Sequence, residues 1–96
     1  MEKITEHYHI VVVADKIYEE LSIQEVNGKW EVYDLWGDLG PEDQVLATFD
    51  DKIGAAKDAL KRLLTKFPGT KPVYGAGALD SATIDKLYKE IKAEQK

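Results

Sequence analysis

The sequence predicts an α+β fold: an antiparallel meander sheet of four strands, possibly five, with one long helix packed on one face and a second, C-terminal helix. From residue 50 to residue 67, apolar residues recur every three or four positions, which is the spacing of a helix with one buried face. Short alternating or continuous apolar segments precede this helix, and Asn27-Gly28 between two of them is typical of a tight hairpin turn. Sequential strands with short connections most simply form an antiparallel meander.

Each strand is predicted from its own pattern. The first ends in a continuous β-branched run, Ile10-Val11-Val12-Val13-Ala14, which is typical of a strand in the middle of a sheet. Residues 1–6, before it, are expected to be a frayed end. The next three segments alternate, so each presents one apolar face. The four strands are expected at residues 7–14, 17–26, 30–36 and 44–49.

The long helix is expected to begin at a cap formed by Asp50 or Asp51 and to stop at Pro68-Gly69. Its predicted apolar stripe consists of Ile53, Ala56, Leu60, Leu63, Leu64 and Phe67. A second helix is predicted over residues 81–93. Between the two helices, residues 72–74 are expected to run extended along the sheet edge, as the possible fifth strand.

Length and composition indicate the broad class of protein. Ninety-six residues form one domain, residues 1–96, with a single core. No apolar run approaches the roughly 18–20 residues that span a bilayer, and the start of the chain does not resemble a signal peptide. With no cysteine, disulfides and thiolate metal sites are excluded. We therefore expect a cytoplasmic protein with no membrane partner.

The net charge of −5 is unevenly distributed. Through Asp51 there are 13 acidic residues and 3 lysines, whereas from Lys52 onward there are 10 basic and 5 acidic residues. Such asymmetry indicates a charged partner or head-to-tail self-association. The alternative is two solvated faces of opposite sign that help the halves dock, although exposed ion pairs contribute little to stability.

No catalytic residue, metal site or cofactor is predicted. His7 and His9 would share one face of a strand, but a metal site needs a third ligand, and only a carboxylate such as Glu6 is near in sequence. The two serines, Ser22 and Ser81, are distant from both histidines along the chain.

Two surfaces are candidates for binding. Tyr18 and Tyr33 are expected on the sheet face opposite the core, and we predict that Tyr18, Glu20, Tyr33 and Asp38 contact a protein partner. The long helix has a basic outer face, which is suited to the phosphates of a nucleic acid. This basic face consists of Lys57, Lys61, Arg62 and Lys66.

Residues 17–67 resemble a WGR domain, a family named after a Trp-Gly-Arg motif. The residues that carry the resemblance are Tyr18, Asn27-Gly28, Trp30, Trp36-Gly37-Asp38-Leu39-Gly40, Gln44, Phe49, Ala56, Leu60 and Leu64. The resemblance implies an antiparallel sheet with one long helix, in a non-catalytic module that contacts DNA or neighbouring domains. Asp38 stands in place of the arginine of the motif, so a carboxylate replaces a cation that would seek phosphate.

These patterns predict a non-catalytic protein-interaction module that is WGR-like in shape, with an acidic sheet half and a basic helix face. Two alternatives remain open. One is a nucleic-acid-binding module that uses the basic helix face, and the other is a small acidic inhibitor or immunity protein that blocks a basic site on its target. The oligomeric state is not indicated by the sequence.

Overall fold

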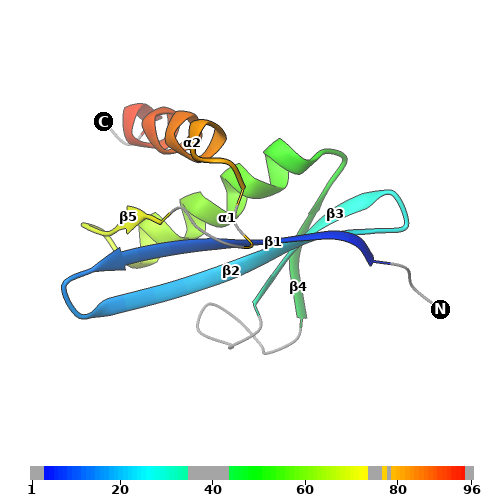
Figure 1. The fold of residues 1–96 in the computed structure, drawn as a ribbon, viewed down its shortest axis with the longest axis horizontal. Coiled ribbons are helices and arrows are strands. Elements are labelled where there is room, and N and C mark those ends of the chain that lie inside the picture. The colour runs from blue at the N-terminus through cyan, green and yellow to red at the C-terminus, as the bar shows by residue number, and fades with distance from the viewer. Residues whose placement is uncertain (1–3, 35–43, 74–76, 78, 95–96) are drawn as a thin grey trace.

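The computed structural model describes residues 4–34, 44–73, 77 and 79–94 (Figure 1). Its fold is α+β, with two helices on the same side of an antiparallel sheet, as the sequence predicts. The elements in chain order are β1 (Ile4–Ala14), β2 (Ile17–Val26), β3 (Lys29–Asp34), β4 (Gln44–Phe49), α1 (Lys52–Lys66), β5 (Lys71–Pro72) and α2 (Ser81–Glu94).

The sheet is a meander with a short fifth strand added at one edge. Its order is β4-β3-β2-β1-β5, and each of the four strand pairs is antiparallel. Between β2 and β3, Asn27 and Gly28 have φ angles of 53° and 83°. Positive φ at both residues is what a two-residue type I′ turn requires, so the predicted hairpin is confirmed.

The edge strand β5 confirms the predicted extended segment, with bounds that differ from the expected residues 72–74. Lys71 and Pro72 pair with Val13 and Val12 of β1. One residue later, the Val73 amide donates a hydrogen bond of 2.9 Å to the Val11 carbonyl. Tyr74 lies outside the described residues.

Two other strand boundaries differ from the prediction. Ile4 and Glu6 belong to β1, where they pair with Val26 and Glu25 of β2, so the expected frayed end is wrong for this part of the chain. The extension follows from the hairpin with β2, because the register set by the Asp15-Lys16 turn places Glu6 opposite Glu25. The strand β3 ends at Asp34. The predicted end of that strand, Trp36, lies outside the described residues.

Helix α1 covers one face of the sheet with a continuous apolar stripe. Asp51 caps the helix, because its carboxylate accepts a hydrogen bond of 2.8 Å from the Gly54 amide. The Phe67 amide donates to the Leu63 carbonyl at the other end, just before Pro68-Gly69. The buried residues of the helix are Ala55, Ala56, Ala59, Leu60, Leu63 and Leu64.

One member of the predicted stripe, Ile53, is not part of the core. Its side chain is 45% exposed, although it lies seven residues before Leu60 and therefore on nearly the same side of the helix. Ile53 lies in the first turn of α1, which begins three residues after the edge strand β4 ends.

Helix α2 packs beside α1 and also contacts the edge strand β5 (Figure 1). Ile84, Leu87 and Ile91 are buried and join the same core cluster as the stripe of α1. The cluster also contains Ile10, Val12, Leu21, Ile23, Trp30 and Val32 of the sheet. Neither α1 nor α2, the helices in the described part of the chain, has the length and apolar character needed to cross a membrane.

We predict that Leu60→Ala lowers the free energy of unfolding by about 2–5 kcal/mol, because it leaves a cavity in a fully buried position. Ile53→Ala is the matched control, and we expect it to cost about 1 kcal/mol or less, since its side chain is half exposed. Urea denaturation followed by tryptophan fluorescence measures both. Equal losses in the two variants would contradict the described position of α1.

Candidate functional site

The sheet face opposite α1 is covered by no described helix (Figure 1). Successive strand residues point to opposite faces, so the pairing register identifies the side chains on this face. We call it the open face. Its members are His7, His9, Val11 and Val13 of β1; Tyr18, Glu20, Ser22, Gln24 and Val26 of β2; Lys29, Glu31 and Tyr33 of β3; and Val45 and Thr48 of β4.

Three of the predicted partner-binding residues lie on the open face. Tyr18 is 65% exposed and pairs across the strands with Val13. Two residues along β2, Glu20 pairs with Val11. Tyr33 reaches the same face from β3. The fourth predicted residue, Asp38, lies outside the described residues, and the binding role of all four stays a prediction.

The two histidines form a polar cluster with Glu20 on the open face. The rings of His7 and His9 meet edge to face, with centroids 4.7 Å apart. The His9 Nδ1 atom lies 2.9 Å from Glu20 Oε2, which is within ion-pair distance, although Nδ1 makes no well-aligned hydrogen bond. On the other side of β1, the His9 amide donates a hydrogen bond of 2.8 Å to the Gly77 carbonyl. The His9 side chain is 37% exposed, so its ring is half-buried between Glu20 and the segment at Gly77.

Folding brings Ser22 opposite His9, a juxtaposition that the sequence analysis missed. Serine, histidine and a carboxylate are the residue types of a hydrolase triad, but the arrangement does not suit that chemistry. Ser22 is only 2% exposed, and the His9 ring packs with its Cδ2 and Nε2 toward Gly77, across β1 from the serine. A two-residue turn at Asp15-Lys16 sets this register, so counting back from that turn would have paired Ser22 with His9.

The described residues contain no group of three or more His, Asp or Glu side chains arranged to hold a metal ion. Glu6, the carboxylate considered as a third ligand, accepts a hydrogen bond of 2.6 Å from the Tyr8 hydroxyl. The Tyr8 ring stacks on the buried Trp30, with centroids 6.2 Å apart. By strand alternation, Glu6 lies on the sheet face opposite the two histidines.

The basic helix face is largely paired with acidic residues of the same chain. Lys57 contacts Glu94 and, at 3.4 Å, Glu90 of α2, while Lys61 lies 3.8 Å from Glu94. The hydrogen bond between Lys57 and Glu94 raises the pKa of Lys57 and lowers that of Glu94. Both groups therefore stay charged around neutral pH, and much of the positive charge on this part of α1 is balanced within the molecule.

Farther along α1, Arg62 donates a hydrogen bond of 2.7 Å to Asp58, one turn earlier in the helix. Lys66 completes the predicted basic face and lies in the last turn. A depression of about 530 Å³ is lined by Asp58, Lys61, Arg62, Thr65 and Lys66. The presence of Asp58 in its wall reduces the attraction of the depression for an anion.

The histidine cluster predicts a pH dependence of stability. Burial, and secondarily the neighbouring His9, lower the pKa of His7, while Glu20 opposes this shift. The unfolded chain therefore takes up the proton first, and stability falls as the pH drops through about 6.5. We expect a lower urea midpoint at pH 5.5 than at pH 7.5, and a smaller decrease in the variant His7→Gln. An unchanged decrease in that variant would show that other groups are responsible.

Comparison of the chain with models of protein families, with curated proteins and with solved structures gave no match. The resemblance to WGR domains therefore stays a prediction. Of its residues, Trp36-Gly37-Asp38-Leu39-Gly40 lie outside the described part of the chain. The two candidate surfaces for function are the open face and the basic helix face.

Proposed function

We propose that this chain is a non-catalytic protein-interaction module that binds its partner through the open face. The observation that carries the proposal is the strongly exposed ring of Tyr18, which lies on a sheet face without a described covering element. Tyrosine supplies a large apolar contact area together with a polar hydroxyl, which is why it is enriched at protein interfaces.

The rest of the open face supports the same function. Val11 and Val13 are half buried beside Tyr18 and Glu20, and Val45 is exposed at the opposite edge. Apolar side chains interspersed with hydrogen-bonding groups are the usual composition of a surface that binds another protein and also remains in water. The inhibitor alternative would use this same face and differs only in the nature of its target.

Nucleic-acid binding is the weaker candidate. The basic helix face would have to give up the contacts of Lys57, Lys61 and Arg62 before it met a phosphate backbone. Duplex DNA is attracted by several cations acting together, and the carboxylates beside these three residues reduce that attraction.

Photo-crosslinking tests the proposed function. A photoreactive amino acid replaces Tyr18 in one variant and Lys86, an exposed residue of α2, in a matched control. In cells that express the protein, we expect the Tyr18 variant to give a discrete crosslinked product with one protein, and the control to give none. An excess of the unmodified protein should abolish the product.

A competition experiment assigns the product to the open face. The variant Val11→Asp places a charge on this face opposite Glu20, and we expect it to compete at least about tenfold less well than Lys86→Glu. Circular dichroism and urea midpoints check that both variants fold. If products form equally from positions 18 and 86, or if Val11→Asp competes as well as the control, the proposed function is wrong.

A further inference from the structure

We infer that two copies of this chain associate through the outer edge of β4, so that one sheet continues across both molecules, with a two-fold axis at Thr48. This contact lies outside the open face and goes beyond the proposed function. Three features carry it: the unprotected edge of β4, the fit of its last three residues to a second copy of themselves, and the exposure of Ile53 beside them.

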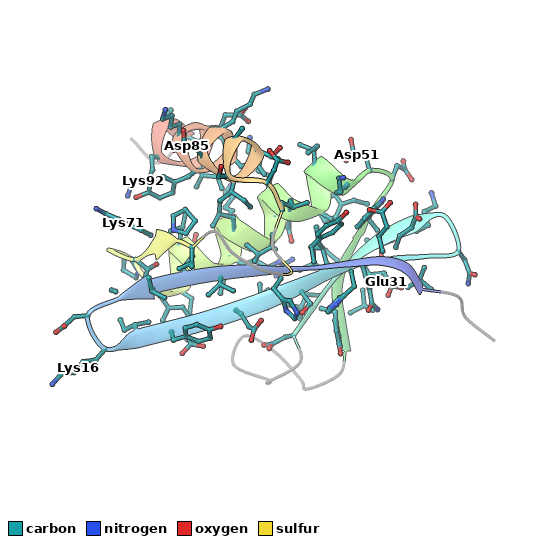
Figure 2. All side chains as sticks on the ribbon, viewed as in Figure 1. Lys16, Glu31, Asp51, Lys71, Asp85 and Lys92 are labelled. Atoms are coloured by element: carbon teal, nitrogen blue, oxygen red, sulfur yellow. The ribbon has the colours of Figure 1, made fainter. Side chains whose placement is uncertain are left out.

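The two edges of the sheet differ in how they are protected. An edge strand presents unpaired amides and carbonyls, and native proteins guard it with a short strand, a lysine or a proline. The edge strand β5 has all three, because it consists of Pro72 and the exposed Lys71 alone (Figure 2). At the other edge, β4 has six residues, Gln44–Phe49, with no charged residue, proline or glycine. Within the described residues no strand pairs with its outer side, so β4 is a template for another strand.

The pairing register identifies the backbone groups of β4 that point outward. Alternate residues of a strand direct their N–H and C=O groups to opposite neighbours. Beside the two-residue turn, Val26 and Lys29 form a hydrogen-bonded pair, so Glu31, two residues later, also bonds to β2. Thr48 is the partner of Glu31 in β4 and is therefore not bonded to β3. Its N–H and C=O point away from the sheet, where the same groups of a second copy can pair with them.

The end of β4 is complementary to a second copy of itself. Leu46 is an extra residue without a partner in β3, so the regular part of the edge is Ala47–Phe49. A two-fold axis at Thr48 places each Thr48 opposite its own copy, which is a favourable cross-strand pair. On the other face, the same axis places the small Ala47 of each copy opposite the large ring of Phe49.

The charges near this edge do not oppose the contact. Ala47–Phe49 carries no charge, and Asp50, which follows it, is paired with Lys29. Glu31 lies one strand further into the sheet, so its Cα atom is three strand spacings, or about 14 Å, from that of its copy. This separation exceeds the screening length of about 8 Å at physiological salt. A chain with a net charge of −5 therefore has an uncharged strip at which two copies can meet.

Ile53 is the second indication of a contact at this place. Helical spacing puts it on nearly the same side of α1 as Leu60, yet it is 45% exposed. The neighbouring Gly54 lies against Phe49, because a Cβ atom on this glycine would be 3.3 Å from the Phe49 ring. An exposed isoleucine thus lies close to the end of the edge strand, where a second copy supplies apolar surface.

Sedimentation equilibrium of the full chain tests the inference. Because the paired segment is short, we expect a monomer–dimer equilibrium with a dissociation constant of about 0.1 mM. Thr48→Lys places two ammonium groups opposite each other and should raise this constant at least about tenfold. Thr65→Lys adds the same charge at an exposed position of α1 and should leave it unchanged. Circular dichroism checks that both variants fold. A chain that stays monomeric at about 1 mM, or equal effects of the two variants, would overturn the inference.

Disulfide crosslinking tests the position of the two-fold axis, because the chain has no cysteine of its own. Hydrogen-bonded neighbours in an antiparallel pair have Cα atoms about 5.5 Å apart, a separation that a disulfide can span. Under mild oxidation, Thr48→Cys should therefore form a covalent dimer, whereas Thr65→Cys under the same conditions should remain monomeric. Equal crosslinking of the two variants would show that the copies do not meet at Thr48 and would overturn the inference.

The proposed function and this inference fail in different ways. Tyr18 lies on β2, which β3 separates from β4. Tyr18→Ser should therefore leave the dissociation constant of the dimer unchanged. A chain that captures a protein from position 18 but stays monomeric retains the proposed function and excludes the β4 contact.

Discussion

The packing of α1 against one face of the antiparallel sheet is the interaction on which the rest of this structure depends. Leu60 and Leu63 are fully buried in a cluster that includes Ile10, Leu21 and Ile23 of the sheet. Successive strand residues point to opposite faces of the sheet. The face that packs against α1 must therefore be apolar, whereas the open face can carry polar side chains. The open face is therefore where the chain carries exposed rings, carboxylates and histidines without loss of its core.

The second consequence of this packing concerns charge. Helix α2 lies beside α1, and its Glu90 and Glu94 meet Lys57 and Lys61. Part of the positive charge in the second half of the sequence is thus paired with carboxylates of the same half. On the sheet, Glu20 and Glu31 lie on the open face, where Lys29 is paired with Asp50.

Local patterns predicted most of the fold, and long-range contacts account for what they missed. Alternation and the Asn27-Gly28 turn predicted β2 with its correct bounds, and helical spacing predicted α1 and α2 within a few residues. The start of β1 follows from its pairing with β2 and was missed because the register was not counted back from the Asp15-Lys16 turn. The exposure of Ile53 is a tertiary property that helical spacing alone does not contain. Likewise, Lys57 and Glu94 are 37 residues apart in sequence. Alternation placed Tyr18, Glu20 and Tyr33 on one face, whereas the meeting of His9 with Ser22 and Glu20 required the strand register.

The central claim is that α1 covers one face of the sheet and that neither described helix lies on the other. Methyl–methyl nuclear Overhauser effects test it most directly, because they report distances between side chains in solution. The structure predicts a network that joins Leu60 and Leu63 to Val12, Leu21 and Ile23, with Val11 and Val13 outside it. Cross-peaks from the α1 leucines to Val11 or Val13 would mean that the helix lies on the other face, and the assignment of the binding surface would fall with it.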